Sequence, residues 1–121
     1  MLVIDASAFT DLILAESEQA MRVRAALAMD AHWCTTEHFV AEVANALRGL
    51  WLRQDIADSE LDRGISALAE LPLDVWPTKP LLPRIRELMR NATVYDAAYV
   101  ALAEEIGGPL VTTDVKLARI P

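Results

Sequence analysis

The feature of this sequence that most constrains its fold is the alternation of short apolar segments with longer segments of helical periodicity. Four short segments, at residues 2–5, 32–35, 73–76 and 109–112, have the length and apolar character of buried strands. Longer segments with helical patterns separate them, as parallel strands joined by helical crossovers require. The alternation predicts a three-layer α/β/α domain with a central parallel sheet of about four strands.

The helical segments are expected at residues 7–16, 17–29, 36–54, 59–71, 81–90 and 93–106, with a short one after Asp114. The segment 36–54 has the strongest pattern, because its apolar residues form one continuous stripe. We expect Ser7, Thr36 and Thr93 to cap the helices that they begin. Gly107 and Gly108 are expected to end the last of the long helices.

Length and charge narrow the class of protein further. A chain of 121 residues suits a single domain, residues 1–121. Its net charge of −7 excludes a protein that holds nucleic acid by charge alone, but not an enzyme that contacts a phosphate backbone. The single cysteine, Cys34, excludes an internal disulfide and favours a reducing, cytoplasmic location. The sequence has neither a signal-peptide pattern nor an apolar run long enough to span a membrane.

Two of the expected strands are followed by a carboxylate. Asp5 follows the first strand and Asp114 follows the last, so a parallel sheet would bring both to its carboxyl edge, where ligands bind in such folds. Glu42 lies at the margin of an apolar helical stripe, and Asp96 lies in the first turn of its helix. Structural roles compete for three of these acids: Asp96 and Asp114 have the spacing of helix caps, and Glu42 suits a solvated helix face.

The four acids have a stronger meaning together than singly. Like charges about 4 Å apart repel by roughly 4 kcal/mol at an effective dielectric constant near 20. A divalent cation would offset this repulsion, and an all-carboxylate set favours Mg²⁺ or Mn²⁺ over zinc. Such sites serve phosphate chemistry. The residues alone thus indicate a metal-dependent phosphoryl hydrolase as one interpretation.

Three stretches, MLVIDASAF, HFVAEVANALRG and VYDAAYVALAEEIGGPLVTTDVKLAR, resemble the PIN-domain ribonucleases, and most of all the VapC toxins of toxin–antitoxin pairs. The resemblance implies a PIN-like fold and an acidic quartet around one or two Mg²⁺ or Mn²⁺ ions, with small hydroxyl residues beside it. The implied quartet is Asp5, Glu42, Asp96 and Asp114, and the implied hydroxyl residues are Ser7 and Thr113.

The resemblance also implies an activity and partners. It implies a toxin that acts as an endoribonuclease and hydrolyses RNA phosphodiester bonds with a metal-activated water, leaving a 5′-phosphate and a 3′-hydroxyl. Its partners would be a VapB-type antitoxin, whose tail blocks the acidic pocket, and a second copy of the chain in a homodimer. Many relatives continue beyond the position of Pro121 into a further edge strand, which puts that edge of the sheet in doubt.

Two other functions compete with this interpretation. A receiver-like, phosphoryl-accepting domain would use Asp5 and Lys116, but the acidic pair at the first strand and the acceptor aspartate at a middle strand are lacking. A non-catalytic module could use the same acids to receive the basic tail of a partner. Cleavage of RNA by the metal-loaded protein alone separates this module from the enzyme.

Several further residues have two interpretations. Arg84 and Arg86 could guide RNA towards the acids or form a solvated helix face. A metal site of His32, His38 and Cys34 is disfavoured, because its ligands are few and the stretch HWCTTEH suits a strand that leads into a helix cap. The apolar residues 12–14 and 21–29 suit either ordinary core or a groove for a partner helix.

Overall fold

A computed structural model describes residues 1–14 and 17–120 of the chain. The sheet has four parallel strands in the order β3-β2-β1-β4, which confirms the predicted fold class. The strands are β1 (Leu2–Ile4), β2 (Trp33–Thr36), β3 (Asp74–Trp76) and β4 (Leu110–Val111). Strand β1 is central and fully buried, as its run of apolar residues requires.

Helices connect all of these strands. They are α1 (Ala6–Leu14), α2 (Glu18–Ala28), α3 (Phe39–Leu52), α4 (Asp58–Glu70), the 3₁₀ turn η1 (Lys79–Leu81), α5 (Leu82–Leu88), α6 (Val94–Ile106) and α7 (Val115–Ala118). The predicted extension of the first helix to Glu16 falls on residues 15–16, outside the described part of the chain. Helix α5 begins later and ends earlier than the segment predicted for it, and η1 precedes it.

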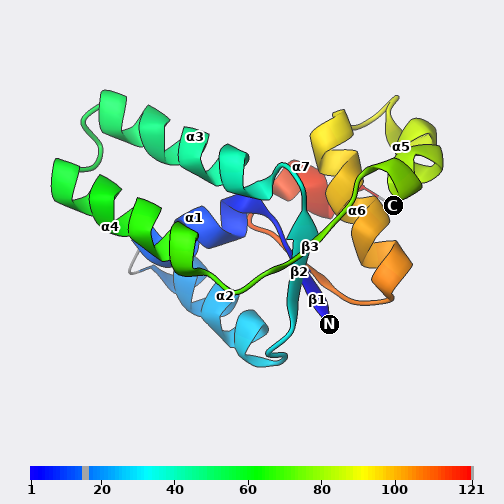
Figure 1. Ribbon diagram of the computed structural model, residues 1–121, viewed down its shortest axis with the longest axis horizontal. Helices are drawn as coiled ribbons and strands as arrows, with labels where there is room; N and C mark the ends of the chain where they lie inside the picture. Colours follow the sequence, from blue (N-terminus) through cyan, green and yellow to red (C-terminus); the bar gives the residue numbers. More distant parts are fainter. Residues whose placement is uncertain (15–16, 121) are drawn as a thin grey trace.

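The helices form layers on the two sides of the sheet (Figure 1). Helix α6 packs against β1, β2 and β4, and α5 packs on α6. Three buried alanines of α6 have small side chains that let this helix lie close to the strands: Ala97, Ala98 and Ala101. On the other side α2 packs against β4 and α1, and the hairpin of α3 and α4 packs on α1 and extends away from the sheet.

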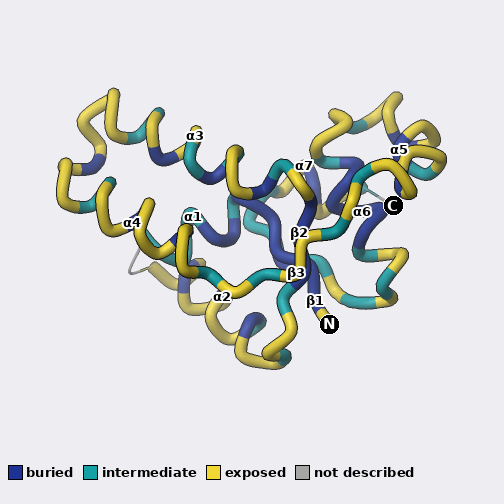
Figure 2. Tube along the Cα trace, viewed as in Figure 1, coloured by how far each residue is buried: buried dark blue, intermediate teal, exposed yellow. Residues whose placement is uncertain are grey.

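The buried residues concentrate where these layers meet. In Figure 2 strand β1 and most of β2 are buried, as are the inward turns of the helices, whereas the edge strand β3 and most of the far end of the α3–α4 hairpin are exposed. Gly64 lies where α4 crosses α3, and a Cβ there would be 3.1 Å from Cδ1 of Leu47. None of the helices in residues 1–14 and 17–120 combines the length and the apolar character needed to cross a membrane.

The structure corrects two of the predicted helix caps. Ser7 lies inside α1, and Oδ1 of Asp5 accepts the capping hydrogen bond from the backbone N–H of Ala8, at 2.9 Å. Thr36 is the buried last residue of β2, because the chain stays extended for longer than its polar sequence suggests, and α3 begins only at Phe39. The caps at the two ends of α6 are as predicted, with Thr93 before it and Gly107 after it at φ +66°.

Candidate active site

A pocket of about 610 Å³ opens at the carboxyl edge of the sheet. The end of β1, the first turns of α1, one side of α3, the start of α6 and the residue before α7 contribute to its lining. The four acids predicted from the sequence all line this pocket: Asp5, Glu42, Asp96 and Asp114. The fold therefore brings together four carboxylates that are as much as 109 residues apart in the chain.

Asp5 is the most buried of the four acids, with only 3% of its surface exposed. Its carboxylate accepts hydrogen bonds from the hydroxyl of Ser7 at 2.9 and 3.0 Å, from the backbone N–H of Ala8, and from the hydroxyl of Thr112. Burial raises the pKa of Asp5, the hydrogen bonds oppose this shift, and the charge of Glu42 adds to it. The network fixes the direction in which this carboxylate points.

The hydroxyl network also joins the two strand ends. Ser7 Oγ lies 3.3 Å from Thr112 Oγ1 and accepts a hydrogen bond from the backbone N–H of Thr113 at 3.1 Å. Two hydroxyl groups therefore contact Asp5, those of Ser7 and Thr112, whereas Thr113 joins the network only through its backbone N–H. The resemblance implies Thr113 as a hydroxyl residue beside the site, and a strand of only two residues carries too little alternation to tell the two threonines apart.

Glu42 reaches the pocket from α3 and is held by a tyrosine of α6. The hydroxyl of Tyr99, a residue 1% exposed, donates a 2.9 Å hydrogen bond to Glu42 Oε1. Burial raises the pKa of Glu42, and the charges of Asp96 and Asp114 add to the shift, while the Tyr99 hydrogen bond opposes it. The Tyr99 ring is itself packed edge-on against His38, with centroids 4.8 Å apart.

The two remaining acids lie at helix starts. The Thr93 hydroxyl accepts a hydrogen bond from the backbone N–H of Asp96 at 3.1 Å, so Asp96 lies in the capped first turn of α6. Asp114 caps α7 through a 2.9 Å hydrogen bond from the backbone N–H of Lys116 to its Oδ1. Burial first, and the charge of Asp114 second, raise the pKa of Asp96. Both acids thus have the capping geometry expected of them and still line the pocket.

The donor set fits a hard divalent cation. Every charged group that the predicted quartet offers is a carboxylate, and burial raises the pKa values of three of the four. Among the described residues, no three of these acids have carboxylate oxygens all within 4.8 Å of one another. A cation would therefore have to draw the side chains inward, for which the more exposed Glu42 and Asp96 have room.

The pocket has further polar residues that the sequence did not single out. Thr10, Asp11 and Asn45 line it, on the faces of α1 and α3 that carry Ser7 and Glu42. Arg53, at the end of α3, is its basic residue; its guanidinium lies 3.4 Å from where a Cβ of Gly49 would be. Helical spacing from Ser7 and Glu42 could have identified Asp11 and Asn45.

The arginines predicted to guide RNA lie outside this lining. Arg84 forms an ion pair with Glu104 of α6, with Nε 2.8 Å from Oε2 and Nη2 3.1 Å from Oε1. Arg86 is an exposed residue of α5. Neither residue lines the acidic pocket, so a contact of either with RNA stays a prediction.

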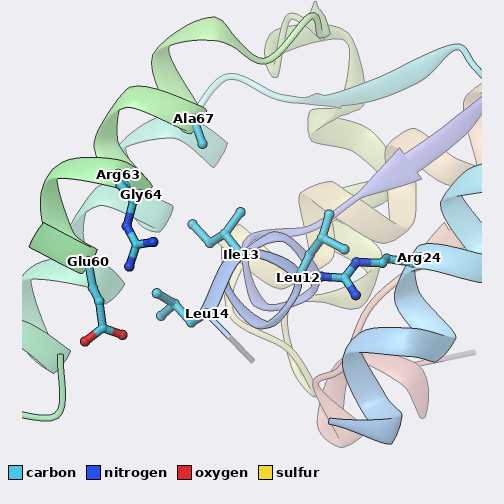
Figure 3. A pocket seen from close by; sticks show the side chains of 8 residues that line it. All are labelled: Leu12, Ile13, Leu14, Arg24, Glu60, Arg63, Gly64 and Ala67. Carbon is cyan, nitrogen blue, oxygen red and sulfur yellow. The ribbon is translucent and has the colours of Figure 1, made fainter. Parts of the chain in front are cut away.

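A second cavity, of about 540 Å³, lies between α1, α2 and α4 and has no lining residue in common with the acidic pocket (Figure 3). Helix α1 contributes the apolar side chains of Leu12, Ile13 and Leu14 to its lining, and α2 and α4 contribute charged side chains. Residues 12–14 also pack against the buried core, as one of the two sequence interpretations expects, and a partner helix in the cavity stays a prediction.

The parallel sheet and the pocket at its carboxyl edge define an α/β protein with an acidic site suited to divalent cations. Comparison with known proteins identifies the family within this class. The PIN domain model matches residues 2–121, and the VapC12 ribonuclease of Mycobacterium tuberculosis is 40% identical over 119 residues, which cover 98% of this chain and 91% of the relative. The chain belongs to the PIN-domain family.

Solved structures support the same fold. The VapC20 toxin of M. tuberculosis, described as cleaving the sarcin-ricin loop, has a TM-score of 0.70 at 13% identity, covering 98% of this chain and 93% of that chain. A toxin–antitoxin complex from Klebsiella pneumoniae has a TM-score of 0.67 at 17% identity, covering 100% and 93%. At these identities the likeness shows the shared fold.

Proposed function

We propose that this protein is a VapC-type toxin that hydrolyses RNA phosphodiester bonds, with Mg²⁺ or Mn²⁺ held by the acidic pocket. The observation that carries the proposal is the convergence of four carboxylates from four parts of a PIN-domain chain on one pocket. Membership of the family and the names of its ribonuclease relatives support the reaction type. The site acts in the cytoplasm, where RNA is present.

Each acid has a role in this proposal. Asp5 and Asp96 hold the cation, and Glu42 and Asp114 complete the acidic set. When bound, the cation supplies Lewis acidity, activates water and neutralises charge on the phosphoryl oxygens. Ser7 and Thr112 orient Asp5, and their hydrogen bonds to it keep its oxygens in place before the substrate arrives.

The remaining polar groups of the pocket act on the substrate. Arg53 binds an RNA phosphate at the edge of the pocket, because a guanidinium pairs well with phosphate oxygens. Glu42 is half-buried, and its raised pKa suits it to accept a proton from water during hydrolysis. The overall negative charge of the chain makes this local arginine important for orienting RNA.

The test is a single isosteric substitution. Asp5→Asn keeps the shape and much of the hydrogen bonding of the side chain but removes its charge. We expect RNA cleavage with Mn²⁺ to fall at least about 100-fold, in the range of removing one preorganised electrostatic group. Asp62→Asn, at an exposed position of α4, is the matched control and should leave cleavage unchanged. Full activity of the Asp5→Asn protein would refute the assignment.

A binding module without catalysis is the second candidate, favoured by the four acids that line one pocket and would attract a basic tail. Purified protein free of any partner decides between the two. Cleavage of RNA in the presence of Mn²⁺ supports the enzyme, and its absence in a folded, Mn²⁺-stabilised protein supports the module.

We also propose that a VapB-type antitoxin binds the cavity in Figure 3 with an amphipathic helix. The cavity offers an apolar floor from α1, and Arg24, Glu60 and Arg63 at its sides can pair with charges on the partner. Arg63→Glu, a change of charge at an exposed residue of the cavity, should weaken binding of the antitoxin and leave cleavage by the free protein intact. The homodimer that the family resemblance implies is tested by sedimentation of the same protein.

A further inference from the structure

Three potential metal ligands lie together at the end of the sheet opposite the acidic pocket. Cys34 of β2 and Asp74 of β3 are paired across the two parallel strands, so their side chains lie on the same face. His32 lies two residues before Cys34, which puts it on that face as well. Strand pairing thus assembles a histidine, a cysteine and an aspartate from segments about 40 residues apart.

The three side chains are close enough to share one ion. Nε2 of His32 lies 3.1 Å from Oδ2 of Asp74, and one ligand atom of each residue lies within 4.8 Å of those of the others. Cys34 is fully buried, whereas the side chains of His32 and Asp74 are 52% and 47% exposed. The cluster therefore has a buried sulfur at its base and a side that is open to solvent.

An unpartnered polar group lies beside this cluster. The buried indole N–H of Trp76 has no hydrogen-bond partner among the described residues, and Trp76 lies two residues from Asp74 on the same face of β3. A thiolate would give this N–H a strong acceptor. Metal coordination is the ordinary way in which a buried thiol becomes a thiolate.

We propose that His32, Cys34 and Asp74 form a second metal site, specific for a borderline-soft divalent cation, with Zn²⁺ as the best fit. Imidazole nitrogen, thiolate sulfur and carboxylate oxygen are the usual ligands of Zn²⁺, and three protein ligands leave a fourth position for water. Mg²⁺ and Mn²⁺ prefer sites made only of oxygen, so the two ends of the sheet select different ions.

The sequence disfavoured a different set of ligands, His32, His38 and Cys34, and the structure does not bring that set together. The stretch HWCTTEH offers His32, Cys34 and His38, but His38 packs against the rings of Tyr95 and Tyr99 at the other end of β2. The third ligand comes instead from Asp74, which only the pairing of β2 with β3 brings near. A metal would therefore connect the edge strand β3 to β2, and its main effect would be on stability.

Cobalt titration of the full chain tests the proposal, because Co²⁺ replaces Zn²⁺ and reports sulfur ligation by a thiolate-to-cobalt charge-transfer band. We expect the band to saturate at one equivalent of Co²⁺ and to disappear on addition of Zn²⁺. Cys34→Ser should abolish it, and His32→Gln or Asp74→Asn should weaken binding at least tenfold. The matched controls His38→Gln and Asp5→Asn should keep the band.

The outcomes are decisive in both directions. The absence of a band, or a band that is unchanged in both His32→Gln and Asp74→Asn, would overturn the proposal. These two variants change half-exposed side chains, so they decide the question even if Cys34→Ser does not fold. In thermal melting, Zn²⁺ should raise the midpoint of the wild-type protein more than that of Asp74→Asn. Because Asp5→Asn tests cleavage at the other end of the sheet, failure of either site leaves the other one standing.

Discussion

Tyr99→Phe removes one hydroxyl group and tests whether α6 orients Glu42. The hydroxyl donates a 2.9 Å hydrogen bond to Glu42 Oε1 from a residue that is 1% exposed. A hydrogen bond to a charged group contributes about 1.5–3 kcal/mol to stability. Because Glu42 is partly exposed, water can replace the lost hydroxyl, so we expect a loss of about 1.5 kcal/mol, at the lower end of this range. If the whole of this roughly 1.5 kcal/mol is lost from the stabilisation of the transition state, cleavage slows about tenfold.

The assay is RNA cleavage over a Mn²⁺ titration, together with thermal melting of the same protein without metal. We expect slower cleavage at saturating Mn²⁺ and a melting midpoint lower by about 5 °C, as the size of the domain predicts for this loss. Tyr95→Phe is the matched control, because Tyr95 lies on the same helix, touches the same His38 ring and is 60% exposed. Wild-type rate and midpoint in Tyr99→Phe, or equal losses in Tyr95→Phe, would refute the reasoning.

Three further predictions concern charge and packing. Burial raises the pKa values of Asp5, Glu42 and Asp96, so these carboxyl groups should stabilise the metal-free folded state as the pH falls towards their ordinary range, whereas the lowered pKa of His38 acts in the opposite direction. Urea unfolding of a His38→Gln protein at a series of pH values isolates the carboxyl contribution, and a steady loss of its stability on acidification would contradict the prediction. Arg53→Gln should weaken binding of RNA to a cleavage-inactive protein several-fold, and Arg22→Gln, at an exposed position of α2 outside the pocket, should not. Gly64→Ala should change the unfolding free energy by less than about 1 kcal/mol, because the better helix propensity of Ala offsets the small shift that its Cβ, 3.1 Å from Cδ1 of Leu47, requires; thermal melting measures this, and cleavage per folded molecule should not change.

The sequence was sufficient for the layer architecture and for the gathering of the acids. Asp5 and Asp114 follow strands that proved to be parallel neighbours, so the strand-end rule alone put them at one edge. The position of Glu42 at the margin of the apolar stripe of α3 also predicted that it would turn partly inward, as its partner Tyr99 shows.

The features that were missed depend on contacts between distant segments. The bond from Thr112 to Asp5 depends on the register of β4 against β1, and a two-residue strand leaves that register open in the sequence. The cluster of His32 and Cys34 with Asp74 depends in the same way on the pairing of β2 with β3. The wrong cap at Thr36 arose because a buried threonine in a strand and a threonine before a helix have the same local sequence.

The carboxylate of Asp5 starts a helix as well as lining the pocket, and this has a consequence for genetics. Its Oδ1 caps α1, so truncation to Ala removes a capping bond of about 1 kcal/mol along with the charge. A screen for alleles that spare the host cell would therefore recover Asp5→Ala partly for lowered protein abundance. Asp5→Asn keeps an oxygen that can accept the hydrogen bond from Ala8. Loss of toxicity in that allele therefore reports on the loss of catalysis and not on the loss of folded protein.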